Sequence, residues 1–261
     1  SLLPDTYRFQ IGDSRQDVVE RMRAAQQKFL AGVWDQRDPD IVVETPEQAV
    51  ILASIVEKET ARADERPRIA SVFENRLRKH MRLQSDPTII YGLVGGKGVL
   101  DHPIQQDELE RDTAYNTYKI DGLPPTPIGN PGRASIEAVL KPAHTKDLYF
   151  VADGTGGHAF APSLEEHNKN VARWRQVERE MRQQEQEAAA AAAAAGQTQG
   201  QAGGAAALPG AGGTLAAPGA LDPNTTAAAQ TGAAQTEAPA EAQDPAAGGS
   251  IPPLPLRNPK R

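Results

Sequence analysis

The chain has no cysteine among its 261 residues. That absence excludes disulfide frameworks, zinc ribbons, iron–sulfur sites and thiol nucleophiles. Basic residues are not in excess, because 28 Lys and Arg stand against 34 Asp and Glu, and the net charge of −6 argues against a general nucleic-acid binder. Long apolar runs are also scarce. The run 49–56 is far shorter than the roughly 20 residues that span a bilayer, so we expect no membrane-inserted helix.

Aromatic residues make up only 5% of the chain, and none follows Trp174. From residue 188 onward, 46 of the 74 residues are Ala, Gly or Pro. Such a segment buries too few large apolar side chains to offset an ordering cost of roughly 1 to 2 kcal/mol per residue. The sequence therefore predicts a folded domain over 1–187 and a disordered low-complexity tail over 188–261.

The folded part is predicted to be α+β, mostly helical with a small antiparallel sheet. Apolar residues at helical spacing behind capping residues indicate the helices, and short apolar runs around a glycine turn indicate a hairpin. The predicted helices cover 14–33, 45–64, 67–77, 86–93, 104–111 and 135–140, and a last helix runs from 163 into the alanine tract. The predicted hairpin pairs 147–152 with 156–160, and 115–118 is predicted to be extended.

Two glutamates, Glu57 and Glu59, directly follow an aliphatic run in the helix predicted over 45–64. At 100° per residue they lie on opposite shoulders of the apolar stripe. Glu59 has the larger aliphatic surround, and burial raises a carboxyl pKa toward the range that suits a general acid at neutral pH. We therefore favour Glu59 as the catalytic residue, with Glu57 as the second candidate. The alternative is that both are solvated, with Glu59 paired to Arg62.

Polar side chains also precede the helix predicted at 86–93. Gln84, Ser85 and Asp86 place an amide, a hydroxyl and a carboxylate together, which suits hydrogen bonds to sugar hydroxyls. The simplest interpretation of Asp86 by itself is an N-cap.

The segment Tyr115, Asn116, Thr117 and Tyr118 precedes a loop, 122–132, that holds four prolines and three glycines. A long, Pro-stiffened loop inside a domain is more often a binding or active-site loop than a simple connector. Two aromatic faces with an amide between them suit stacking on a sugar polymer. An ordinary half-buried strand would show the same residue pattern.

Neither a metal nor a nucleotide is indicated. His158, His167 and Asp153 do not have the spacing of a helical ligand pair, and no thiolate is available. The glycine turns at 95–98 and 154–157 lack the Lys-Ser/Thr ending of a phosphate loop. We therefore expect no metal and no cofactor.

Nine short motifs follow one another along the chain. They are LLPDTYRF, ASIVEKET, SVFENRL, MRLQSDPTIIYGL, AYNTY, GLPPTPIGNPG, ASIEAVLKPA, LYFVADGTGGHAF and HNKNV. In this order they resemble the catalytic domain of the YceG-like (MltG) endolytic murein transglycosylases. The resemblance covers residues 2–174, nearly all of the part predicted to fold.

The resemblance implies a bacterial lyase of cell wall biogenesis that cuts peptidoglycan strands between N-acetylmuramic acid and N-acetylglucosamine, leaving 1,6-anhydro ends and in this way terminating strand elongation. The family's catalytic glutamate, the second of the Glu-Lys-Glu triplet, aligns with Glu59. It would protonate the glycosidic oxygen and then take the proton of the muramic acid C6 hydroxyl as that oxygen attacks C1. A helix-borne acid beside a small sheet also suggests a lysozyme-like arrangement.

The resemblance implies further site residues, partners and a location. The positions that would bind glycan are Gln84, Ser85, Asp86, Tyr115, Asn116, Thr117, Tyr118 and His158. The implied partners are peptidoglycan glycan strands and cell wall synthases, with no nucleic acid. The family is anchored in the inner membrane by an amino-terminal helix, followed by a LysM-like region, with the catalytic domain on the outer side. This chain contains neither segment, so we expect the chain itself to be soluble. We expect it to belong to the bacterial cell envelope and to reach the membrane only through the amino-terminal helix.

Two alternatives stay open from the residues. A hydrolase would use a second carboxylate, either Asp86 or Glu57, to activate water. A non-catalytic peptidoglycan-binding or scaffold module of the cell wall synthesis machinery would use the aromatic segment 115–118 without turnover.

Overall fold

The computed structural model describes residues 1–201 of the chain. The chain divides into two compact units. The first, Ser1–Glu185 in its described part, contains the hydrophobic core. Of the second, the structure describes residues 186–201, which are helical.

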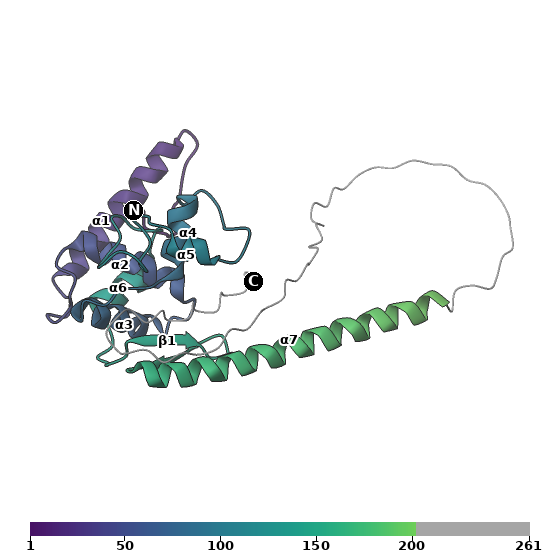
Figure 1. Ribbon diagram of the computed structural model, residues 1–261. Coiled ribbons are helices and arrows are strands. Elements are labelled where there is room, and N and C mark those ends of the chain that lie inside the picture. The colour runs from purple at the N-terminus through teal and green to yellow at the C-terminus, as the bar shows by residue number, and fades with distance from the viewer. Residues whose placement is uncertain (202–261) are drawn as a thin grey trace, which may run out of the picture. The chain divides into compact units, whose positions relative to one another are not determined.

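The described residues form an α+β fold dominated by helices, as predicted (Figure 1). The helices are α1 (Arg15–Trp34), α2 (Pro46–Glu59), α3 (Arg66–Arg78), α4 (Asp86–Val94), α5 (Gln106–Glu110), α6 (Arg133–Leu140) and α7 (Leu164–Gln201). The strands β1 (Tyr149–Ala152) and β2 (His158–Ala161) form one antiparallel hairpin in which Phe150 lies opposite Phe160.

Helix α2 lies at the centre of the core, packed against α3 and α6 (Figure 1). Its apolar run 49–56 is buried on nearly all sides, as expected for a helix that is hydrophobic around its whole circumference. Ile69 and Phe73 of α3 and Ile136 of α6 complete the core around it. A helix held this firmly is a rigid support for any side chain at its end.

Helix α2 ends five residues earlier than predicted, at Glu59 rather than Asp64. Thr60 adopts an extended backbone (φ −141°, ψ 141°), and its hydroxyl accepts a 3.0 Å bond from the Arg62 N–H and donates a 3.3 Å bond to Glu65. Local bonds from a Thr side chain to nearby groups compete with helix continuation. The early stop makes Glu59 the last residue of the central helix.

The hairpin packs against α3 on one side and α7 on the other. Phe150 meets Phe73 of α3 edge to face, with ring centroids 5.9 Å apart. Tyr149 stacks on His167 of α7 at 5.1 Å. The turn after β1 is close to α7 as well, because a Cβ on Gly154 would lie 2.7 Å from Val177. The hairpin is thus a fixed part of the domain.

The segment 115–118, predicted to be extended, is a turn. The Asn116 side chain explains this, because its Nδ2 donates to the carbonyl oxygens of Leu109 (2.9 Å) and Arg111 (2.7 Å). The backbone N–H of Lys119 also donates to the Asn116 carbonyl at 2.8 Å. An Asn that bonds to the backbone on both sides favours a turn over a strand.

Helix α7 continues through the alanine tract to Gln201. Residues 188–201, predicted to be part of a disordered tail, are therefore helical, which agrees with the high helix propensity of alanine. The remainder of the predicted tail, 202–261, lies outside the described residues. Within residues 1–201, no helix combines the length and the apolar character needed to cross a bilayer.

Candidate active site

Glu59 lies at the edge of the core, half-buried at the end of α2. Its Oε1 accepts a 2.5 Å hydrogen bond from the hydroxyl of Ser85, the buried N-cap residue of α4. Its Oε2 makes no hydrogen bond within residues 1–201 and is not enclosed by them. One carboxyl oxygen is therefore held by the protein, and the other has no hydrogen-bond partner among the described residues.

The surroundings of Glu59 favour its protonated form. Burial is the main cause, and the negative charge of Asp86 adds to it. The Ser85 hydrogen bond and the positive charge of Arg76 act in the opposite direction. The result is a pKa of about 7 instead of the ordinary 4.5. At neutral pH a large fraction of Glu59 carries the proton that a general acid must donate.

Asp86 is the first residue of α4 and does not cap it, contrary to the sequence-based interpretation. Ser85 takes the N-cap position, and Asp86 Oδ1 instead accepts a 2.6 Å bond from the Tyr118 hydroxyl. Burial raises the pKa of Asp86 to about 6, although the bond from Tyr118 opposes the shift. Burial also raises the pKa of Tyr118, followed by the effect of the Asp86 charge, so the phenol remains a donor.

A buried arginine holds the loop that leads into α4. Arg76 Nη1 donates to the carbonyl oxygens of Arg82 (3.1 Å) and Leu83 (3.0 Å) and to Gln84 Oε1 (3.1 Å). Its Nε donates to the carbonyl oxygen of Leu148 at 2.6 Å, just before β1. Because one planar guanidinium binds acceptors on both sides, it fixes the loop relative to the hairpin.

Thr117 holds the same loop from the other side. Its carbonyl accepts the N–H of Gln84 (3.1 Å), and its hydroxyl accepts the N–H of Ser85 (2.9 Å) and pairs with Thr88 (2.8 Å). Gln84 has a left-handed backbone (φ 52°), so the loop needs such support. Asn116 and Thr117 are themselves buried, with their polar atoms used inside the protein.

Glu57 has a different environment from Glu59. Its Oε2 accepts hydrogen bonds from the N–H of Gly132 (3.0 Å) and from the hydroxyl of Ser135 (2.6 Å). Both donors belong to the first turn of α6 or its cap, where unpaired N–H groups and the helix dipole favour a negative charge. Glu57 thus joins α2 to the start of α6.

The Pro-rich loop 122–132 is held along its length. The Tyr115 hydroxyl shares a 2.6 Å bond with Thr126 Oγ1. The N–H of Ile128 donates to Ser54 Oγ on α2 at 3.0 Å. The loop therefore joins the aromatic segment to the helix that ends at the acid.

His158 belongs to another network, at the start of β2. Its Nδ1 lies 2.7 Å from Glu65 Oε2, and its backbone N–H donates to Glu65 Oε1 at 3.0 Å. Arg62, expected as a partner of Glu59 in the solvated alternative, instead pairs with Asp64 (2.7 Å) and Glu65 (3.5 Å).

The structure thus links Glu59, Ser85, Asp86, Thr117 and Tyr118 through hydrogen bonds and charge, with Gln84 on the same loop. Glu57 and His158 lie in separate networks. Sequence reasoning missed Arg76 and Glu65. A signal for Arg76 existed, because it follows Phe73 at the i+3 position of the apolar face of α3, where a charged residue indicates a buried network.

This combination of a rigid helix, one partly buried acid with an open oxygen and a second buried carboxyl nearby is the geometry of an acid–base catalytic domain. Within residues 1–201, no group of three or more metal-ligating side chains comes together. The YceG-like family model matches residues 1–173, and the chain belongs to that family.

Curated relatives carry a specific name. The chain is similar to the endolytic murein transglycosylase of Bacillus subtilis (strain 168), with 39% identity over 169 residues, which are 64% of this chain and 45% of that protein. It is also similar to the endolytic murein transglycosylase of Streptococcus pneumoniae serotype 2, with 35% identity over 175 residues, which are 66% of this chain and 31% of that protein. The chain therefore spans less than half the length of either relative.

A solved structure supports the membership of the YceG-like family. The crystal structure of a yceG-like protein from Listeria monocytogenes is similar to this chain at a TM-score of 0.54 and 39% identity. The match covers 64% of this chain and 53% of the Listeria chain.

Proposed function

We propose that this domain is a lytic transglycosylase that cuts peptidoglycan glycan strands between N-acetylmuramic acid and N-acetylglucosamine, leaving 1,6-anhydro ends. The observation that carries the proposal is the Glu59 carboxyl, which has a pKa of about 7 and an Oε2 without a hydrogen-bond partner within residues 1–201. The names of the curated relatives, endolytic murein transglycosylases, support the choice of substrate.

The reaction needs only this one carboxyl. Protonated Glu59 donates its proton to the glycosidic oxygen, and the bond from that oxygen to C1 of the muramic acid breaks. The C6 hydroxyl oxygen of the same sugar then bonds to C1, and its proton passes to the Glu59 carboxylate. The acid returns to its protonated state, and no water is consumed. A pKa near the working pH suits a group that must both give and accept a proton.

A hydrolase would need a second carboxylate to activate water or to attack C1. Asp86 accepts a bond from Tyr118, and Glu57 accepts two bonds at the start of α6. Each of these two carboxyls has one oxygen held by donors within the protein. The names of the curated relatives, endolytic murein transglycosylases, favour the lyase over the hydrolase.

The remaining site residues have different tasks in this proposal. Gln84, Tyr115, Tyr118 and His158 bind the glycan around the acid, whereas Ser85 is buried and donates its hydroxyl to Glu59. Asn116 and Thr117 are buried and hold the loop and turn that present those side chains. Asp86 raises the pKa of the acid through its charge.

The substrate of this proposal places the protein in the bacterial cell envelope, where peptidoglycan lies. The same proposal includes association with cell wall synthases and a role in ending strand elongation. It also includes attachment of the protein to the inner membrane through a preceding helix.

Mass spectrometry of the products tests the proposal directly. Purified glycan strands incubated with the chain should give fragments whose new ends are lighter than hydrolytic ends by one water. Hydrolytic ends would contradict the lyase mechanism. Binding to sacculi with no fragments released would instead favour the non-catalytic binding module.

A further inference from the structure

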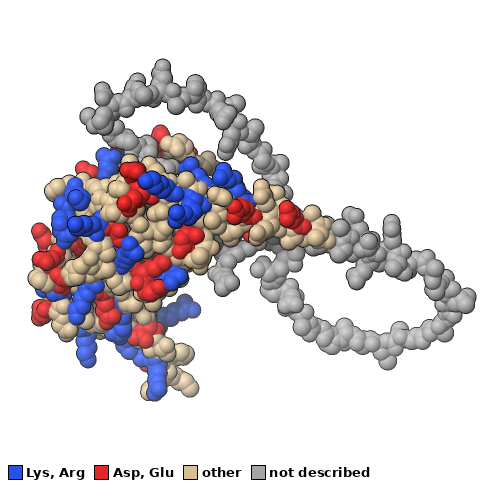
Figure 2. All heavy atoms as spheres, turned by 90° about the horizontal axis from the view of Figure 1, so that it is seen from below, with Lys and Arg blue, Asp and Glu red and all other residues tan. Residues whose placement is uncertain are grey.

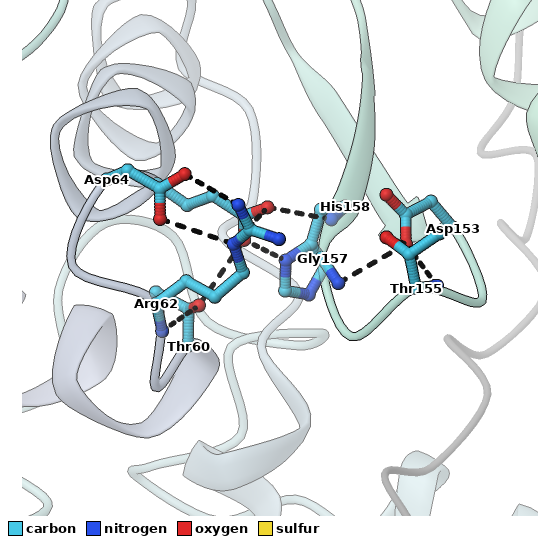
Figure 3. Close-up of polar contacts among 8 residues, drawn as sticks. Thr60, Arg62, Asp64, Asp153, Thr155, Gly157 and His158 are labelled. Carbon is cyan, nitrogen blue, oxygen red and sulfur yellow. Dashed lines mark hydrogen bonds and ion pairs between the residues drawn. The ribbon is translucent and has the colours of Figure 1, made fainter.

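A hydrogen-bonded network begins at the residue after the acid and ends on the hairpin. Thr60 donates to Glu65 Oε2, and the same oxygen lies 2.7 Å from His158 Nδ1. Figure 3 shows Thr60 and Arg62 on one side and His158 on the other, with Gly157 and Asp153 in the adjoining turn. The network therefore connects the end of α2 to β2.

Glu65 is the centre of this network and acts as a carboxylate. Its Oε1 accepts the backbone N–H of His158 at 3.0 Å and lies 3.5 Å from Arg62 Nε, while its Oε2 faces Thr60 and the His158 ring. The Thr60 hydroxyl, the His158 backbone N–H and the Arg62 cation all supply hydrogens to it. Glu65 is also the residue before α3, but its side chain makes no bond to the helix end and is free for this role.

The glycine turn before His158 is shaped around the Glu65 carboxylate. A Cβ on Gly157 would lie only 2.5 Å from Glu65 Oε1 and 3.2 Å from Asp153 Oδ2. Asp153 closes the turn by accepting the N–H of Thr155 (2.7 Å) and of Gly157 (3.2 Å). A side chain at position 157 would push the carboxylate away, so glycine is needed for close approach rather than for flexibility.

These contacts decide which nitrogen of His158 carries the proton. A carboxylate only accepts hydrogen bonds, so Nδ1 is the N–H donor to Glu65, and in the Nδ1–H tautomer Nε2 is an acceptor. Nε2 makes no hydrogen bond within residues 1–201 and is not enclosed by them. The ring is also held edge to face against Phe150 at 5.3 Å, so it cannot turn freely.

We propose that Glu65 is a positioning residue that presents His158 Nε2 as a fixed hydrogen-bond acceptor for a sugar hydroxyl of the glycan strand. The proposal rests on the proposed function, because it assigns the sugar polymer as the ligand of His158. Glycan hydroxyls are donors, and an acceptor tied to the residue after Glu59 would align the strand relative to the acid. Glu65 itself touches no substrate.

The first test reads the tautomer without any substrate. In the 15N-labelled full chain, long-range proton–nitrogen spectra should show His158 protonated at Nδ1 and unprotonated at Nε2, with the signals assigned by their loss in His158→Gln. Glu65→Gln keeps the shape, but its amide oxygen must accept the His158 backbone N–H, which leaves the NH₂ facing Nδ1. That variant should therefore move the proton to Nε2. A wild-type ring protonated at Nε2, or an unchanged tautomer in Glu65→Gln, would overturn the proposal.

The second test reads glycan binding where no cleavage interferes. In a Glu59→Gln background, Glu65→Gln should raise the Kd for purified uncut glycan strands by about fivefold, the loss expected for one hydrogen bond. The matched control is Asp64→Asn, which removes the same charge from an exposed pair with Arg62 and should change Kd less than about twofold. A shifted tautomer with unchanged Kd would show that Nε2 does not contact the strand.

A third measurement uses a protein in which Glu65 is unchanged. It therefore tests the proposal even if the Glu65→Gln variant does not fold. Adding glycan strands to Glu59→Gln should shift the His158 Nε2 resonance, and binding without such a shift would overturn the proposal. The proposed function fails separately, through a wild-type chain that releases no anhydro-ended product. The two failures are therefore distinguishable.

Discussion

Glu57 and Glu59 are the same residue type, two positions apart on one helix, both half-buried, yet the structure gives them opposite tasks. Glu57 accepts two hydrogen bonds at the start of α6, where a negative charge is favoured. Glu59 accepts one, from Ser85, beside the negative charge of Asp86. The Glu57 carboxyl joins two helices, and the Glu59 carboxyl has a pKa near 7.

The difference teaches that the role of a carboxyl depends on the donors and charges of the facing element. Glu57 and Glu59 project from opposite shoulders of α2, so each meets a different neighbour. The start of α6 offers an N–H and a hydroxyl as hydrogen-bond donors to Glu57. At Glu59, burial is the main cause that destabilises the anion; the charge of Asp86 at the start of α4 adds to it, and the Ser85 hydroxyl opposes it. The following predictions test this contrast.

The largest effect is expected in catalysis. Glu59→Gln should reduce release of anhydro-ended products by about a thousandfold or more, because general acid–base catalysis contributes roughly 10² to 10⁴ in rate and this carboxyl serves in both proton transfers. Product release from purified glycan strands measures it. Glu57→Gln is the matched control and should retain activity within about threefold. Undiminished turnover in Glu59→Gln, or a loss confined to Glu57→Gln, would reverse the assignment of the two carboxyls.

A second effect concerns the pH dependence of stability. The folded-state pKa of Glu59 is raised from 4.5 to about 7, so the folded protein resists its ionisation. The associated stability is fully present below pH 4.5 and is lost as pH rises through 7. Relative to Glu59→Gln, the wild type should therefore lose roughly 2 to 3 kcal/mol of unfolding free energy between pH 4.5 and pH 8. Urea unfolding at several pH values measures it, and parallel curves for the two proteins would refute the raised pKa.

Changes at Glu57 should alter stability more than chemistry. Glu57→Ala removes the acceptor of two bonds and should cost about 2 kcal/mol of unfolding free energy. Glu57→Gln can keep both bonds on its amide oxygen and loses only the charge at the start of α6, so it should cost less than about 1 kcal/mol. Denaturant unfolding of both variants checks the order. Equal costs would mean that the charge matters rather than the hydrogen bonds.

The smallest effect is a shift of the pH–rate profile. Because the acid must be protonated, the rate should fall as pH rises through about 7. Asp86→Asn removes the like charge and should move the pH at which the rate falls to a value lower by roughly half a unit. Ser85→Ala removes a hydrogen bond to the Glu59 anion and should move that pH to a higher value by a similar amount. Rates from pH 5 to 9 test both. Shifts in the same direction would contradict the described surroundings of Glu59.

Much of the fold could be predicted from the sequence because its signals are local. The capping residues, apolar spacing and glycine turn correctly indicated the helices, the hairpin and the α+β class, since these patterns act within a few residues. The end of α2 could not be predicted from spacing, because the Thr60 hydroxyl stops the helix through bonds to Arg62 and Glu65. The turn at Asn116 was missed for a similar reason.

Prediction of the candidate site was less complete. The preference for Glu59 came from its aliphatic neighbours, and its role as the catalytic acid remains a prediction. Asp86 was expected to be a cap, because a carboxylate before a helix start has no visible partner in a sequence. Its partner, Tyr118, lies 32 residues away. Arg76 and Glu65 were missed because each acts through residues that are distant in the chain, Leu148 and His158.

The sequence by itself determined the class, the helices and the position of two glutamates on opposite shoulders of one helix, because composition and periodicity act locally. It also determined the family, through motifs in fixed order. Only the tertiary structure decided which donors and charges each glutamate meets, and therefore where the pKa rises. The physical reason is that desolvation and charge act through space, between residues that only folding brings together.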